Sequence, residues 1–221
     1  MVSILAIGAH PDDIELGCSA TLLRHGKFGD IIYLLVLSKG EASGDPEIRE
    51  GECRNAAKLM GANKIIFGGL EDTKIHNGIE TIMVIEKVIN ELNPDVIYTH
   101  SYKDTHQDHR NVSYATLSAG RRSKKILMYE SPTTFGDFQP QLFVDIEEEF
   151  EKKKEIMRSY FSQSEKHWWS IGRLRRERAP RAVEGLAVYR GFQAGVEVAE
   201  AFEVGKLVLM ADEQLFSNAL E

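Results

Sequence analysis

The sequence has few cysteines, no long apolar run and no excess of positive charge. Cys18 and Cys53 are the two cysteines among 221 residues, so we expect neither a disulfide framework nor a cysteine-rich zinc knuckle. The longest apolar run, residues 31–37, is far too short to span a bilayer. The apolar stretch near the N-terminus lacks the basic residues that begin a signal peptide. These absences predict a reduced, cytoplasmic protein without a membrane span.

The balance of charge points away from acidic partners. The chain has 27 lysines and arginines against 34 aspartates and glutamates, which gives a net charge of −7. Nucleic-acid-binding proteins and proteins that bind anionic membranes usually carry the opposite sign, so we expect no nucleic-acid partner. The apolar fraction of 43% is enough for a buried core. We expect one domain over residues 1–221, with a core at 1–130 and an extension at 131–221 that completes the site and contacts other subunits.

Short apolar segments alternate with amphipathic ones over the first 130 residues. Strands that are apolar throughout, with helices between them, indicate a parallel sheet covered on both faces. The pattern predicts an α/β fold: a doubly wound, mostly parallel, Rossmann-like sheet flanked by helices, with a C-terminal decoration. The predicted strands are 2–8, 30–38, 64–67, 95–99, 126–129 and 142–146, and the predicted helices are 15–26, 47–60, 79–92, 110–119 and a charged one at 147–162.

Two polar segments follow the first and the fourth predicted strands. The segment His10-Pro11-Asp12-Asp13 follows the first strand, and a loop at 100–109, rich in histidine and aspartate, follows the fourth. If the strand order is 3-2-1-4-5, these two strands are neighbours, and ligands bind beyond their carboxyl ends. The two segments should therefore meet in one crevice.

The residue types in these segments suit a catalytic metal. A catalytic zinc takes three nitrogen or oxygen ligands from the protein and one water molecule, whose pKa it lowers to roughly 7. His10 and Asp13 are three residues apart, so a tight turn can direct both to one point, and His109 supplies a distant third ligand. Asp12 lies beside the turn and is the predicted general base. Zn²⁺ is the expected cofactor, although another divalent metal could use the same ligands.

His106 and Asp108 complete the predicted machinery. A protonated His106 would stabilise a tetrahedral oxyanion and later protonate a leaving amine. Asp108 would fix the orientation of a histidine. Together with a metal and a base, these groups favour hydrolysis of an amide.

Residues 9–17 and 104–109 resemble the two signatures of the PIG-L/LmbE-like zinc N-deacetylase family. The segment at 49–52, beginning with Arg49, is similar to the arginine-bearing helix of that family, and the C-terminal part has weaker likenesses at 162–163 and 190–202. The resemblance implies removal of an acetyl group from an N-acetylated amino sugar, such as N-acetylglucosamine, or from a sugar conjugate. It implies the same metal ligands, base and acid as above.

The resemblance also suggests where the substrate lies. Arg49 stands at the position of a substrate-contacting arginine, and Asp104 stands where some members carry a tyrosine near the substrate, so we expect both to contact the substrate. Gln107 replaces a common proline, Ser19-Ala20 replaces a usual glycine pair, and Tyr160 stands where many members have a histidine. These departures leave the identity of the substrate open.

Simpler interpretations exist for several of these residues. Asp12 or Asp13 could cap the start of a helix, His106 could be the fourth ligand of a closed structural zinc site, and Arg49 could form an exposed ion pair with Glu52. One functional alternative is a zinc amidase that acts on another small amide, such as a thiol conjugate. Another is a nucleotide-binding Rossmann module without catalysis, but it would require a glycine-rich turn where this chain has two carboxylates.

A basic segment stands out in the C-terminal part. Residues 173–181 contain five arginines in nine positions. They could form a subunit contact, or they could bind phosphate on a substrate because guanidinium groups match phosphate oxygens. The pair Trp168-Trp169 could stack on a sugar ring or lie between subunits. We expect a homo-oligomer.

Overall fold

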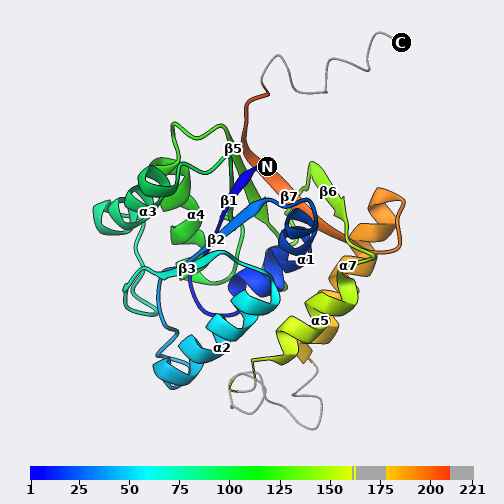
Figure 1. Ribbon diagram of the computed structural model, residues 1–221, viewed down its shortest axis with the longest axis horizontal. Coiled ribbons are helices and arrows are strands. Elements are labelled where there is room, and N and C mark those ends of the chain that lie inside the picture. Colours follow the sequence, from blue (N-terminus) through cyan, green and yellow to red (C-terminus); the bar gives the residue numbers. More distant parts are fainter. Residues whose placement is uncertain (161, 163–177, 210–221) are drawn as a thin grey trace.

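The computed structural model describes residues 1–160, 162 and 178–209 (Figure 1). Across these residues the strands form one seven-stranded sheet in the order β3-β2-β1-β4-β5-β7-β6. The predicted order 3-2-1-4-5 and the predicted doubly wound α/β class are therefore confirmed. The five parallel strands are β1 (Ser3–Gly8), β2 (Ile31–Val36), β3 (Lys64–Phe67), β4 (Val96–His100) and β5 (Lys125–Tyr129).

Helices lie close to the predicted positions, but α4 begins earlier than the sequence pattern indicates. Its first residue is Gln107 and not residue 110, because Nδ1 of His106 accepts a hydrogen bond from the backbone N–H of Asp108 (3.2 Å) and caps the helix. The prediction that His109 lies in a loop is therefore wrong, and it lies in the first helical turn. The helices are α1 (Asp13–Lys27), α2 (Pro46–Leu59), α3 (Ile79–Leu92), α4 (Gln107–Ala119), α5 (Phe150–Arg158) and α7 (Arg178–Ala194).

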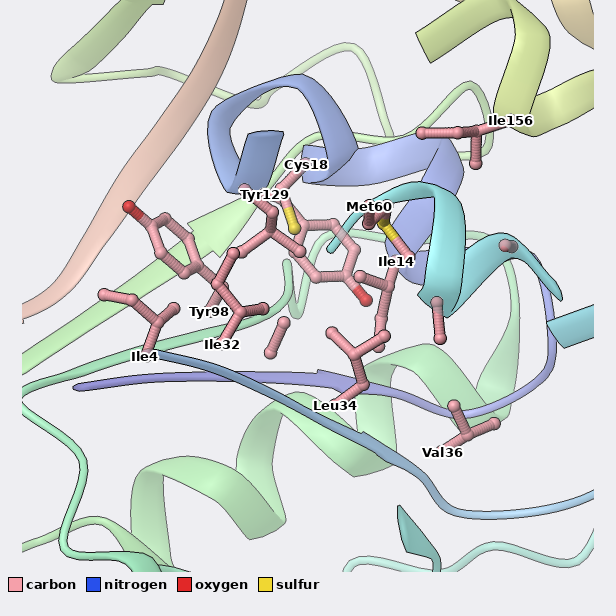
Figure 2. Close-up of a cluster of buried hydrophobic side chains, with 14 of the residues drawn as sticks. Ile4, Ile14, Cys18, Ile32, Leu34, Val36, Met60, Tyr98, Tyr129 and Ile156 are labelled. Carbon is pink, nitrogen blue, oxygen red and sulfur yellow. The ribbon is translucent and has the colours of Figure 1, made fainter. Parts of the chain in front are cut away.

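Both faces of the sheet are buried, because successive residues of the central strands enter different cores. On β1, Ile4 joins side chains of α1, α2 and α5 in one core, whereas Leu5 joins side chains of α3 and α4 in the other. Figure 2 shows the first core, in which Ile14 of α1 and Met60, next to the end of α2, pack above the strands. Two covered faces explain why these strands are apolar throughout.

The C-terminal part extends the sheet with two antiparallel strands. Strand β7 (Ala199–Leu207) pairs with β5 on one side and with β6 (Leu142–Asp145) on the other. The sequence predicts β6 and a longer version of α5, but it predicts neither α7 nor β7. The pattern of β7 is hidden because Glu200 and Glu203 interrupt its apolar residues without regular alternation, although both side chains are buried. Helices α5 and α7 lie on the same side as α1, opposite α3 and α4 (Figure 1).

Among the described residues, no helix combines the length and the apolar character that a bilayer crossing requires.

Candidate active site

The two polar segments meet at the carboxyl ends of β1 and β4, as predicted. Strand β1 ends at Gly8 and is followed by the turn that leads into α1, and β4 ends at His100 and is followed by the loop that leads into α4. The strands are neighbours in the sheet, and the strand order reverses at this point. Both helices therefore begin at the same edge of the sheet.

Asp13 is the centre of the arrangement, because its two carboxylate oxygens contact three histidines: His10, His100 and His109. Oδ2 lies 3.3 Å from Nδ1 of His10, and Oδ1 lies 3.2 Å from Nε2 of His109. The backbone N–H of His10 also donates to Oδ2 (2.7 Å), which fixes the tight turn. Burial alone would raise the pKa of Asp13, but His109, His100 and His10 hold that pKa well below its usual range. The three predicted metal ligands thus lie together, with the ionised carboxylate of Asp13 in contact with both His10 and His109.

The donor atoms in this cluster fit a divalent metal. His10, His106 and His109 offer nitrogen atoms that lie within 4.8 Å of one another, and so do the donor atoms of Asp13, His100 and His109. Imidazole nitrogen and carboxylate oxygen are the usual ligands of zinc in enzymes, and the same set accepts other divalent ions. The residues present are therefore suited to holding the expected metal.

Two carboxylates face the other nitrogen of His10. Its Nε2 lies 3.0 Å from Oδ1 of Asp72 and 3.1 Å from Oδ2 of Asp108. Asp108 is fully buried and also accepts the backbone N–H of Thr73 (2.8 Å). Burial lowers the pKa of His10, but Asp13, Asp108 and Asp72 together raise it well above its ordinary value. Asp108 therefore lies where a residue that orients His10 would lie. The sequence-based prediction does not include Asp72. The feature of the sequence that could have indicated it is a carboxylate in the loop after β3.

His109 is sandwiched between two other histidines. Its ring stacks on His100 at a centroid distance of 4.0 Å and on His106 at 4.6 Å. Nε2 of His100 lies 3.1 Å from Oδ2 of Asp13. Burial, followed by the nearby charge of His109, lowers the pKa of His100 to about 4, so His100 is a neutral ring at neutral pH. The stack fixes the plane of the His109 ring.

Asp104 is buried and contacts the outer nitrogen of His109. Its side chain is 1% exposed, and its Oδ1 lies 3.2 Å from Nδ1 of His109. The other oxygen accepts hydrogen bonds from Ser131 and Thr133 (2.9 Å each). The expected substrate contact by Asp104 is not supported, because its oxygens are buried and occupied. The position instead favours an orienting role toward His109.

Asp12 occupies a strained backbone position at the start of α1. Its φ of 99° is unusual for a residue other than glycine, and such strain is common in active sites. The carboxylate makes no capping hydrogen bond, so the capping interpretation of Asp12 is wrong, and the side chain is 25% exposed. Desolvation raises the pKa of Asp12 to about 6, although Arg49 opposes the rise. A carboxylate with this pKa suits proton transfer near neutral pH.

Arg49 is buried against the turn at residues 10–13. It is 3% exposed, and its guanidinium donates to the carbonyl oxygens of Pro11 (2.7 Å) and Gly40 (2.8 Å) and lies 3.6 Å from the Asp12 carboxylate. A side chain at Gly40 would overlap the guanidinium, so glycine is required there. In the described part of the chain Arg49 is buried and forms no ion pair with Glu52, whose carboxylate accepts hydrogen bonds from Ser162. The expected substrate contact is also not supported, because Arg49 faces the backbone of the turn.

His106 is half-buried beside His10 and His109. Because its Nδ1 accepts the backbone N–H of Asp108, the neutral ring carries its proton on Nε2. Burial, and then the charges of His109 and His10, lower the pKa of His106. His106 is therefore a neutral ring that can donate one hydrogen bond, whereas the sequence-based expectation is a protonated ring. The backbone N–H of Asp108, in the first turn of α4, makes the contact that orients the ring of His106.

The basic segment and the tryptophan pair fall mostly in undescribed parts of the chain. Residues 173–177 and Trp168-Trp169 are outside the described residues. Of the predicted arginine run, the structure describes the chain from 178 to 181, where Arg181 lies exposed on α7.

Comparisons with known proteins identify a family and several relatives of this chain. The family model described as "PIG-L: GlcNAc-PI de-N-acetylase" matches residues 5–120. The uncharacterized deacetylase YaiS of Escherichia coli K12 is 42% identical over 154 residues, which are 66% of this chain and 83% of that protein. Diacetylchitobiose deacetylase of Thermococcus kodakarensis is 27% identical over 89% of this chain and 80% of its own length. A conserved Thermus thermophilus protein of known structure is 26% identical, with a TM-score of 0.81 over 96% of this chain and 98% of its own.

Proposed function

The chain belongs to the PIG-L family of de-N-acetylases, and on this premise we propose that it removes the N-acetyl group from an amino sugar or a sugar conjugate with the help of a divalent metal, zinc in the first instance. The observation that carries the proposal is the contact of Asp13 with both His10 and His109. It joins the two signature segments into one cluster of metal-binding groups. The name of the diacetylchitobiose deacetylase relative supports an N-acetylated sugar as the substrate class.

His10, Asp13 and His109 would hold the metal. When bound, the metal would supply a Lewis acid for the amide carbonyl and a water molecule that loses its proton near neutral pH. Asp108 and Asp104 would keep the two histidine rings in position through their outer nitrogens. His100 would steady Asp13 and the ring of His109.

Asp12 would act as the general base. It is next to the ligand Asp13, it is partly exposed, and its pKa of about 6 leaves it ionised at neutral pH. It would take a proton from the attacking water as the carbon–oxygen bond forms at the acetyl carbonyl. Arg49 would favour the ionised form and hold the turn through Pro11.

His106 would stabilise the oxyanion that forms on the acetyl oxygen. Its ring can donate one hydrogen bond from Nε2 while Nδ1 is occupied by the backbone of α4. The tetrahedral carbon would then expel the sugar nitrogen, which receives the proton that Asp12 took from the water, while the neutral ring of His106 keeps its own proton. The products would be acetate and a free amino sugar.

The proposal includes self-association in the cytoplasm. Helix α7 exposes an apolar stripe made of Val188, Tyr189 and Phe192, the last of which is 83% exposed. Apolar stripes of this kind favour contacts between subunits. Sedimentation of the purified protein would test this part, and a monomer at micromolar concentration would contradict it.

The substrate class can be tested with a panel of amides. Zinc-loaded protein would be incubated with N-acetylglucosamine, N,N′-diacetylchitobiose, an N-acetylglucosamine conjugate and a thiol-conjugate amide, and both acetate and primary amine would be measured. We expect equimolar acetate and amine from at least one acetylated sugar. Cleavage of the thiol-conjugate amide alone would support the alternative amidase, and no cleavage by metal-loaded protein would contradict the proposal.

A further inference from the structure

Helix α1, which begins with the catalytic turn, is broken at Cys18. The backbone of Cys18 is not helical (φ −143°, ψ 18°), so a first turn at 13–17 is followed by a separate helical segment. A break of this kind leaves carbonyl groups before it and N–H groups after it that need new partners. Where those partners come from determines what holds the first turn in place.

Two buried charged residues of the C-terminal part supply the partners. In an unbroken helix, the N–H of Ala20 would donate to the carbonyl of Leu16. Here the N–H of Ala20 donates to Oε1 of Glu200 (3.1 Å), and the carbonyl of Leu16 accepts from Nζ of Lys153 (2.8 Å). Glu200 also accepts from the N–H (2.8 Å) and the hydroxyl (2.6 Å) of Thr21. Glu200 and Lys153 therefore supply the partners that the N–H of Ala20 and the carbonyl of Leu16 would give each other in an unbroken helix.

Lys153 and Glu200 also pair with each other. Nζ of Lys153 lies 2.5 Å from Oε1 of Glu200, and the residues are 1% and 5% exposed. Lys153 lies on α5 and Glu200 on β7, so both belong to the C-terminal part. The attraction within a buried ion pair offsets the desolvation of its two charges only if hydrogen bonds also satisfy their remaining atoms. The break in α1 provides those hydrogen bonds.

The first turn of α1 also packs tightly against Tyr129 of β5. A side chain at Gly17 would overlap the ring of Tyr129, whose hydroxyl donates to the carbonyl of Ile7 on β1 (2.9 Å). Figure 2 shows Tyr129 and Cys18 in the same core. The N–H of Leu16 in turn donates to the carbonyl of Asp12 (2.9 Å). The backbone of Leu16 thus connects Lys153 to Asp12: its carbonyl accepts from Lys153, and its N–H donates to the carbonyl of Asp12, the predicted base.

We propose that Lys153 and Glu200 are positioning residues that set the orientation of the first turn of α1, and with it Asp12 and Asp13. The C-terminal part then does more than cover the sheet, because the geometry of the metal cluster depends on its docking. The inference rests on the proposed function, since it assigns the pair an effect on metal binding. The hydrogen bonds of Lys153 and Glu200 go to Leu16, Ala20, Thr21 and each other, and none goes to a proposed metal ligand.

Metal binding to single variants tests this inference without a substrate. Lys153→Met leaves the Leu16 carbonyl without its donor and Glu200 without its partner. We expect it to weaken Zn²⁺ binding, measured by competition with a chelator, by about tenfold or more, and to alter the absorption spectrum of the Co²⁺-loaded protein. Adding Glu200→Gln should restore part of the affinity, because it removes the unpaired buried charge.

A second buried ion pair provides the matched control. Arg190 on α7 holds Glu130 through two hydrogen bonds (2.5 and 2.6 Å), and neither residue bonds to α1 in the described structure. The double variant Arg190→Gln/Glu130→Gln should lower the melting temperature but leave the Zn²⁺ affinity and the Co²⁺ spectrum unchanged. An effect on metal binding as large as that of Lys153→Met would overturn the inference.

The outcome also separates this inference from the proposed function. If folded Lys153→Met binds Zn²⁺ as the wild type does, with the same Co²⁺ spectrum, the positioning role is refuted and the proposed function stands. If the wild-type protein binds no metal, the proposed function fails, and the inference fails with it. If Lys153→Met does not fold, Thr21→Val decides, because it removes only the hydroxyl contact to Glu200; unchanged metal affinity in Thr21→Val would then refute the inference.

Discussion

Oδ1 of Asp13 and Nε2 of His109 lie 3.2 Å apart, although Asp13 begins α1 and His109 lies in the first turn of α4. Each residue follows a strand of the parallel sheet, and those strands, β1 and β4, are neighbours. The contact is therefore a consequence of strand order, because the order reverses between these two strands and both helices start at the same edge. A site built this way requires both strands, β1 and β4, together with the helices that follow them.

Removing His109 should remove the metal. We expect His109→Ala to bind less than about a tenth of the Zn²⁺ that the wild type binds, because a catalytic zinc site has only three protein ligands. Metal analysis after gel filtration measures the content. His76→Ala is the control, since His76 is exposed and belongs to none of the candidate metal groups. Wild-type metal content in His109→Ala would mean that His100 or another histidine is the ligand.

Asp12→Asn should keep the metal and lose activity. Asparagine has the same shape and tolerates a positive φ, so the strained turn should persist. Loss of a general base typically lowers the rate by about 10²–10⁴-fold. Acetate release and metal content, measured on the same preparation, test both halves of the prediction. Turnover near the wild-type rate would transfer the role of base to another residue, and Asp108 would be the next candidate.

His106→Asn should lower kcat without changing metal content. Asparagine is as good a helix cap as any residue, so α4 should keep its first turn while the ring donor is lost. Removal of one donor to an oxyanion lowers kcat by on the order of 10²–10³-fold. If the metal is lost together with the activity, His106 is a fourth ligand and the closed structural zinc site is the better interpretation.

Arg49→Gln should shift the pH dependence toward higher pH. The guanidinium lies 3.6 Å from the Asp12 carboxylate and favours its ionised form, so its removal raises the pKa of Asp12 from about 6. Asp12 acts as a base only above its pKa, so the acidic limb of kcat/KM should move upward by roughly 1 pH unit or more. Arg49→Lys, which keeps the charge, is the control. Identical acidic limbs in the two variants would show that Arg49 does not tune Asp12.

The core and the two signature segments could be predicted because their signals are local. Apolar strands such as residues 31–36 are recognisable from composition, and the topology rule then brings the segments after β1 and β4 together. His10, Asp13 and His109 are found in this way. Their convergence needs no knowledge of side-chain packing.

The rest depends on contacts between distant residues that leave no local pattern. Asp72 follows a different strand and reaches His10 only in the folded chain. Asp104 lies in a polar segment of the sequence, where exposure is expected, but in the fold it is buried and accepts hydrogen bonds from Ser131 and Thr133. Strand β7 is hard to predict because the charge of Glu200 interrupts its apolar pattern, and the partner of that charge, Lys153, lies far away in sequence on helix α5.

A metal titration followed by acetate release tests the central claim most directly. Protein stripped with a chelator would be titrated with Zn²⁺, and acetate release from the best N-acetylated substrate would be measured at each step. The account predicts no activity without metal, a linear rise that ends at one equivalent per chain, and no rise in Asp13→Ala. Full activity in the stripped protein, or activation by Zn²⁺ in Asp13→Ala equal to that of the wild type, would contradict it.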